Sequence, residues 1–217
     1  MLLLAFDTAT PAITAAVHDG ERVLAESTTV DARRHGELLM PSIVSVLDQA
    51  GVTRHDVTAV AVGIGPGPYT GLRVGLVTAR VLGAVLGVPV HGVCTLDAIA
   101  RAAITAAAGR EYLVATDARR KEVYWARYTA AGQRILGPAV GQPASLDPAV
   151  PAAGEGPLLY PAAFGEPIGP RYPAASWLAD FVSERLAAGA VLEPAEPLYL
   201  RKPDARVPGP PKRVSAA

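Results

Sequence analysis

The glycine-rich segment between residues 62 and 83, VGIGPGPYTGLRVGLVTARVLG, constrains the fold more than any other part of the sequence. It follows an apolar run at residues 57–62 that is typical of a strand covered on both faces. It predicts a helix from Gly71 to Leu86, which Thr70 could cap. Because an interior glycine costs a helix about 1 kcal/mol relative to alanine, the small residues on one helix face predict close packing, either against the chain's own sheet or against a partner helix. These residues recur at every fourth position: Gly71, Gly75, Ala79, Gly83 and Gly87.

The same segment departs from both common phosphate-binding patterns. It lacks the lysine and hydroxyl residue that end G-x-x-x-x-G-K-[ST], and Pro68 or Thr70 stands where G-x-G-x-x-G requires its last glycine. Pro66 and Pro68 also have no N–H group that could bind an anion. The segment therefore indicates packing rather than phosphate binding.

Apolar periodicity and turn residues predict an N-terminal α/β lobe of order βββαβαβα. Thr95 could cap its last, alanine-rich helix, and Gly109 ends that helix. The other expected elements are strands at residues 2–6, 12–17, 22–29, 57–62 and 88–93, and helices at 35–50 and 71–86.

A second, smaller lobe is expected to follow. It opens with a strand at 112–116 and two strands that turn at Gly132, and it returns to helix at 176–188 after an irregular stretch. Beyond Arg201 the chain has almost nothing to bury. We therefore expect an N-terminal lobe at residues 1–108, a C-terminal lobe at 109–201 and a disordered tail at 202–217.

Charge and composition exclude several classes of protein. The 217 residues include 20 basic and 20 acidic side chains, which leave no net field to attract nucleic acid, so tight RNA binding by this chain alone is not expected. Cys94 is the single cysteine, the N-terminus MLLLAFD lacks the features of a signal peptide, and no apolar run approaches the about 18 residues of a membrane span. We expect a cytoplasmic protein without a membrane segment.

Few residues suggest catalysis. Asp7 and Asp117 each end the first strand of a lobe, so with Thr8 they could face a nucleotide between the lobes. An ATP-dependent small-molecule kinase or a ribonuclease-H-like nuclease would depend on these two carboxylates alone. Cys94 has no local base beside it. We expect no catalytic residue and no cofactor, and we keep the enzyme as the alternative.

The motifs resemble those of the bacterial TsaB (YeaZ) family. The segment GIGPGPYTGLRVGLVTARVLG is similar to the family signature G-x-G-P-G-[ST]-[FY]-T-G-[LI]-R, with Pro68 in place of the Ser or Thr. The segments AFDTAT, HGELLMP, TLDAIA, DARRKEVYWA, GEG and PLYLR also resemble family positions. The resemblance covers residues 1–201.

The resemblance implies both a fold and a function. The implied fold is α/β, with two ribonuclease-H-like lobes of the sugar kinase, heat-shock-70 and actin superfamily and a reduced second lobe. The implied function is that of a non-catalytic subunit in the complex that makes threonylcarbamoyladenosine next to the anticodon of tRNAs reading codons that begin with A. Its partners would be the kinase-like catalytic paralogue TsaD and the small ATPase TsaE, with tRNA bound only within the complex. Alone, the chain would form a homodimer, and a signalling role for that homodimer is a weaker alternative.

The two helices around the glycine segment are where we expect the partner to bind. On the helix at 35–50, apolar side chains remain after the core is covered, and on the helix at 71–86 the ribbon of small residues would admit a foreign helix. The expected interface is Leu38, Met40, Val44, Leu72, Gly75, Leu76, Ala79 and Gly83.

Metal analysis of the purified protein is expected to find no stoichiometric zinc or iron. The catalytic paralogue holds its metal with two histidines one helical turn apart, whereas here His35 is followed four residues later by Leu39. One tightly bound ion per chain would contradict this prediction.

Overall fold

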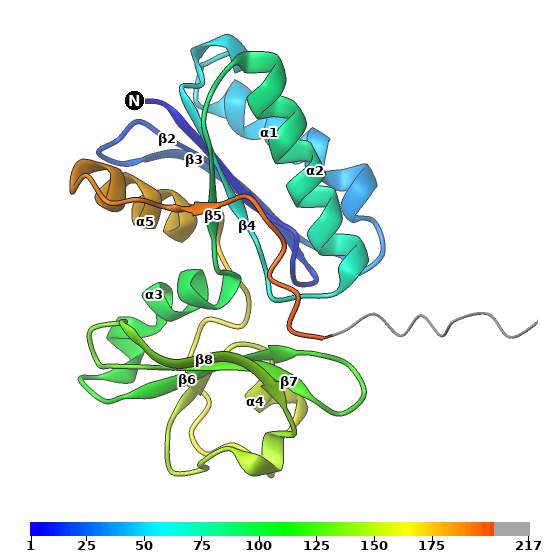
Figure 1. Cartoon of the computed structure of the whole chain (residues 1–217), viewed down its shortest axis with the longest axis vertical. Coiled ribbons are helices and arrows are strands. Elements are labelled where there is room, and N and C mark those ends of the chain that lie inside the picture. Colours follow the sequence, from blue (N-terminus) through cyan, green and yellow to red (C-terminus); the bar gives the residue numbers. More distant parts are fainter. Residues whose placement is uncertain (202–217) are drawn as a thin grey trace, which may run out of the picture.

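Residues 1–201 are described by the computed structural model, and they form two α/β lobes, one above the other in Figure 1. The tail expected at 202–217 lies outside the described residues.

The first lobe is built on a mixed sheet of strand order β10-β5-β4-β1-β2-β3. β1, β2 and β3 form an antiparallel meander, and β1 pairs with β4, and β4 with β5, in parallel. This order is that of a ribonuclease-H-like lobe, as predicted. The strands are β1 (Leu3–Asp7), β2 (Ala12–His18), β3 (Val23–Val30), β4 (Ala59–Gly63), β5 (Val90–Val93) and β10 (Glu193–Pro194).

Helices cover both faces of this sheet. α1 (His35–Gln49) and α2 (Tyr69–Leu86) lie side by side on one face, and α5 (Ala175–Ala187) lies on the other (Figure 1). A short 3-10 turn, Arg54–Asp56, precedes β4. Because side chains alternate along a strand, Leu4 and Phe6 of β1 pack toward α1 and α2, and Leu3 and Ala5 pack toward α5.

The second lobe repeats part of this topology around a sheet of order β8-β7-β6-β9. Its strands are β6 (Tyr112–Asp117), β7 (Val123–Tyr128), β8 (Arg134–Gly141) and β9 (Ala152–Ala153), again an antiparallel meander with a parallel neighbour. α3 (Thr95–Ala107) packs on one face. The other face is covered by Leu146, Val150 and Phe164, in a segment whose short helical pieces are Pro143–Ser145 and α4 (Gly156–Leu159). The second lobe is therefore reduced, as expected.

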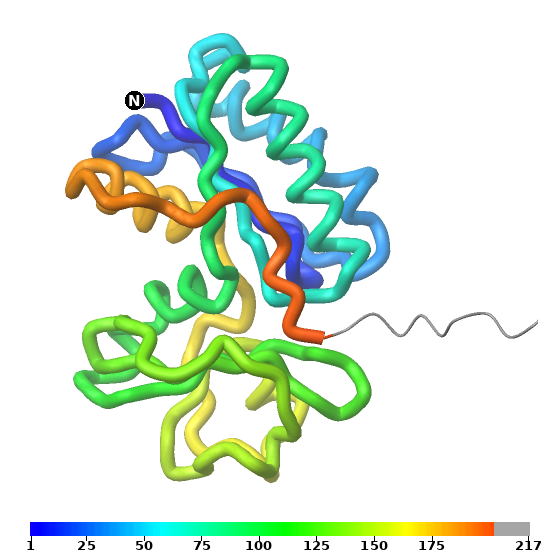
Figure 2. Tube along the Cα trace, in the orientation of Figure 1, coloured from blue at the N-terminus to red at the C-terminus, as the bar shows by residue number. Residues whose placement is uncertain are grey.

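The chain crosses between the lobes twice, which the predicted division at residue 109 does not describe. α3 follows the first sheet in sequence but packs on the second, and α5 follows the second sheet but packs on the first. After α5, β10 adds to the edge of the first sheet, and Figure 2 shows this C-terminal segment running on toward the second lobe. There Arg201 Nη1 donates to the carbonyl of Ala118 over 3.0 Å.

The glycine ribbon of α2 faces the chain's own sheet. A Cβ on Gly75 would lie 2.5 Å from the hydroxyl oxygen of Thr8, and a Cβ on Gly83 would lie 2.3 Å from Cγ2 of Val90. The Thr8 hydroxyl donates to the carbonyl of Gly71 over 2.7 Å and accepts the N–H of Gly75 over 3.0 Å, so it sits within the backbone ladder of α2. The glycines therefore serve packing within the fold.

Two predicted helix caps are wrong. α2 begins at Tyr69 after Pro68, so Thr70 lies inside the helix, and Thr95 is the first residue of α3 rather than its cap. The Thr95 hydroxyl instead donates to Oδ2 of Asp7 over 2.7 Å.

This contact belongs to a buried network around Asp7. Oδ1 of Asp7 accepts the N–H of Ala9 over 2.6 Å, and the Thr95 oxygen accepts the N–H of Gly65 over 3.2 Å. A Cβ on Gly63 would lie 1.9 Å from the Asp7 carboxylate, so the carboxylate packs on bare backbone. Burial raises the pKa of Asp7 to about 6, although the bonds from Thr95 and Ala9 oppose this effect.

Gly75→Ala is expected to destabilise the protein by about 1–3 kcal/mol, because the overpacking against Thr8 outweighs the gain in helix propensity. Gly36→Ala in α1 is the matched control: a Cβ there meets nothing within 4 Å, so this change should stabilise the fold by about 0.5–1 kcal/mol. Urea unfolding measures both, and equal effects would contradict the packing role of Gly75.

Asp7→Asn is expected to remove one component of the pH dependence of stability. The pKa of Asp7 is higher in the folded chain, about 6, than its ordinary 3.8, so the folded state binds this proton more tightly and the stabilisation declines as pH rises through that window. The unfolding free energy of wild type minus that of Asp7→Asn should therefore fall by about 3 kcal/mol between about pH 4 and pH 7. A difference that is constant or rises across this range would refute the raised pKa.

Candidate functional site

The predicted cleft residues do not assemble into an open nucleotide site. Asp7 and Thr8 are buried, and their polar atoms are engaged in the contacts described above, so neither presents a free ligand to the cleft. Asp117 forms an ion pair with Arg119, whose Nη1 lies 3.1 Å from Oδ2. The space beside Asp117 and Pro68 measures about 10 Å³, room for about one water. A neighbouring pocket of about 200 Å³, walled by Thr8 and His35, is below the usual size for a ligand of nucleotide dimensions.

The candidate nucleophile and metal ligands occupy structural positions. Nε2 of His35 donates to the carbonyl of Thr10 over 2.8 Å, which ties the start of α1 to the β1–β2 turn. Leu39, one turn later, is buried in the core. Burial raises the pKa of the Cys94 thiol to about 12, so it is a poor nucleophile at neutral pH.

One serine, histidine and aspartate do meet, between β2 and α5. Nε2 of His18 lies 3.0 Å from Asp180, and Nδ1 of His18 lies 3.2 Å from the hydroxyl of Ser183. However, Nδ1 also accepts the N–H of Gly20 over 2.9 Å, and both His18 and Ser183 are buried. This set holds α5 on the β2–β3 hairpin rather than presenting a nucleophile.

The residues of the expected partner surface differ in exposure between the two helices. On α1, Met40 and Val44 are 44% and 51% exposed, and Leu38 is half-buried. On α2 the predicted residues are buried against the chain's own sheet, so they cannot contact a partner: Leu72, Gly75, Leu76, Ala79 and Gly83.

The exposed side of α2 carries valines instead. Val77, Val81 and Val85 are 60%, 54% and 74% exposed and stand one above the other at intervals of four residues. Together with Met40 and Val44 they form what we call the α1–α2 face. Monomeric proteins rarely leave a large apolar surface uncovered.

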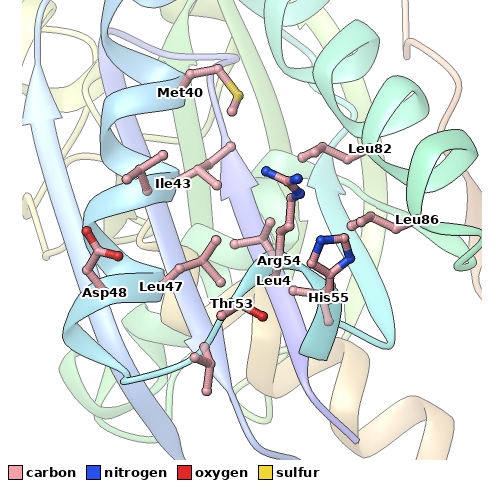
Figure 3. Close-up of a pocket in the computed structure, with 13 residues that line it drawn as sticks. Leu4, Met40, Ile43, Leu47, Asp48, Thr53, Arg54, His55, Leu82 and Leu86 are labelled. Atoms are coloured by element: carbon pink, nitrogen blue, oxygen red, sulfur yellow. The ribbon is translucent and has the colours of Figure 1, made fainter.

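A groove of about 440 Å³ runs beside this face, between α1 and α2. Figure 3 shows Met40, Ile43 and Leu47 on its α1 side and Leu82 and Leu86 on its α2 side. Arg54 and His55, from the turn before β4, lie between the two helices. The groove therefore offers apolar walls, with the guanidinium of Arg54 and the carboxylate of Asp48 among its polar groups.

The four-residue spacing of these valines is visible in the sequence and indicates a second apolar side of α2, opposite the small residues. α2 is apolar on both sides: its 18 residues have a mean hydropathy of 1.3, yet only 33% of them are buried. By length and composition alone α2 could cross a membrane, which is weak evidence but differs from the expectation that no segment approaches a span. An apolar helix with a buried small-residue face must expose its other apolar face.

Comparisons with known proteins agree with the sequence motifs. The sequence model of a family described as TsaD, tRNA N6-adenosine threonylcarbamoyltransferase, matches residues 22–165. An uncharacterized protein of Mycobacterium tuberculosis is 46% identical over 208 residues, covering 94% of this chain and 93% of that protein. The tRNA threonylcarbamoyladenosine biosynthesis protein TsaB of Escherichia coli is 37% identical over 128 residues, 59% of this chain and 55% of that protein.

Solved structures extend the match over nearly the whole fold. YeaZ from Pseudomonas aeruginosa matches with a TM-score of 0.76 and 32% identity, covering 92% of this chain and 99% of that one. A second Pseudomonas aeruginosa structure, of an uncharacterized protein with similarity to the peptidase YeaZ, matches with a TM-score of 0.79 and the same identity and coverage. With the glycine signature, the two-lobed topology and this coverage, the chain belongs to the TsaB (YeaZ) family.

Proposed function

We propose that this protein is a non-catalytic subunit of the complex that makes threonylcarbamoyladenosine in tRNA, and that it binds the kinase-like paralogue TsaD through the α1–α2 face. The observation that carries the proposal is the exposed apolar surface of Val77, Val81 and Val85 beside Met40 and Val44. The names of the relatives and of the matching family support the pathway.

The chemistry of the surface suits a helical partner. Its centre is aliphatic, and Arg73 and Arg80 lie on the exposed side of α2, each already bonded to the C-terminal segment, to Tyr199 and Ala195 respectively. An apolar centre with charged groups at its edge is typical of a stable protein interface. Two antiparallel helices of the partner would complete a four-helix contact.

The buried state of Asp7 supports the non-catalytic part of the proposal. A kinase or nuclease would need this carboxylate open to a metal ion, yet it is enclosed by Thr95, Ala9 and Gly63. TsaE as a further partner, a homodimer through the same face when the chain is alone, and a cytoplasmic location belong to the same proposal. Turnover of ATP or cleavage of nucleic acid by the purified chain would favour the enzyme instead.

Val81→Arg is expected to leave the isolated protein folded and to weaken binding to TsaD by at least about 30-fold, because it places a charge at the centre of an apolar contact. Threonylcarbamoyladenosine in cellular tRNA should fall accordingly. Size-exclusion chromatography of the mixed proteins and nucleoside analysis of tRNA are the measurements.

Val191→Arg is the matched control, because Val191 is 98% exposed and lies outside the α1–α2 face. It should bind TsaD as the wild type does. Ala79→Arg, which the sequence alone would suggest, is unsuitable because Ala79 is fully buried. Wild-type binding by a folded Val81→Arg protein would refute the proposed interface.

A further inference from the structure

A polar pocket of about 550 Å³ lies where the two crossover helices pass each other, away from the α1–α2 face. We call it the hinge pocket; its walls come from α3, from the β7–β8 turn with the start of β8, and from α5. Figure 1 shows α3 and α5 at the waist of the molecule, α5 against the first lobe and α3 against the second. A molecule bound there would touch elements of both lobes.

Three arginines from three different elements line the hinge pocket: Arg101 of α3, Arg134 of β8 and Arg185 of α5. Arg101 forms an ion pair with Glu184, and Arg134 Nη1 lies 3.4 Å from Asp97 and its Nη2 lies 4.0 Å from Glu193, which stands outside the pocket lining. Within the lining, three guanidinium groups therefore face two carboxylates. Arg185 stacks on Phe181, 5.1 Å from the ring centroid, and has no ion pair with a carboxylate in the described part of the chain.

In two of these guanidinium groups one nitrogen is closed off from the pocket. Nε of Arg101 and Nη1 of Arg134 are enclosed by protein atoms and make no hydrogen bond within residues 1–201, so a ligand in the pocket would have to contact other nitrogens of these groups. The 3.4 Å contact from Nη1 to Asp97 is longer than a good N–H···O bond, and Asp97 already accepts the hydroxyl of Tyr128 over 2.8 Å. A guanidinium can only donate, and the side chains of Arg101 and Arg134 are 30% and 27% exposed, so their more accessible N–H groups are the ones that a ligand in the pocket can reach.

We propose that the hinge pocket binds a small phosphate ester, whose phosphoryl oxygens accept from Arg101, Arg134 and Arg185. A phosphoryl group presents several acceptor oxygens and a charge near −2, which suits donors carried by three different elements around one pocket, and arginine is the side chain best matched to it. The volume is that of a site for a ligand of nucleotide size. Ile104 and Phe181 in the lining offer apolar contact to the rest of such a ligand.

The bound ester would also hold the lobes at one angle, because Arg134 belongs to the second sheet whereas Arg185 lies on the helix that packs on the first. This role is separate from the partner interface and does not depend on it.

The test is isothermal titration calorimetry of the full chain with AMP and, separately, with inorganic phosphate, at constant ionic strength set with sodium chloride. AMP should bind saturably and more tightly than inorganic phosphate. Arg185→Gln should weaken the binding of AMP by about tenfold, the loss of one charge-assisted contact. Arg22→Gln, the same change at a side chain that is 80% exposed in the β2–β3 turn, should leave it unchanged.

Circular dichroism of both variants checks that they fold. We expect Arg185→Gln to fold because Arg185 is exposed. Absence of saturable binding of either probe, or equal weakening by the two variants, would overturn the site. Equal affinity for inorganic phosphate and AMP would overturn the part of the proposal that concerns Ile104 and Phe181.

Discussion

The insertion of the Thr8 hydroxyl into the backbone of α2 is the contact on which the rest of the structure depends. It requires bare backbone at Gly71 and Gly75, and it brings α2 onto the end of β1 at a distance that no side chain allows. Because this contact places the small-residue side of α2 against the sheet, the valine side must face outward. The same glycines that complete the core of the first lobe thus create the surface that we assign to a partner.

The network around Asp7 shows how a carboxylate at the end of β1 can become structural. Enclosure by Gly63 removes the carboxylate from water, and Thr95 reaches it from the first residue of α3. The side chain thereby links β1, the glycine-rich loop and the helix that leads to the second lobe. A buried charge of this kind is stabilised by its hydrogen bonds rather than by solvent, and it is not free to hold a metal ion.

Sequence patterns predicted the order of elements along the chain as far as α3, and the three antiparallel strands that open the second lobe, because alternation and turn residues are local signals. They could not decide which side of α2 faces the sheet: the small residues at Gly75 and Ala79 and the valines at Val77 and Val81 are both apolar stripes, and only the position of Thr8 selects between them. Thr95 fits the pattern of a cap, yet it serves a carboxylate 88 residues away in sequence. The hinge pocket was also beyond prediction, because Arg101, Arg134 and Arg185 meet only through the two crossings.

The double crossing bears on how the chain is completed during synthesis. The side of the first sheet formed by Leu3, Ala5 and Ala61 is covered mainly by α5, which ends at Ala187. Until α5 has emerged from the ribosome, the nascent first lobe exposes this apolar side of its sheet. The exposure lasts throughout the translation of the second lobe. Cotranslational folding of the first lobe therefore cannot finish before nearly the whole described chain has emerged, and that interval is when the nascent protein is most open to chaperones and to aggregation.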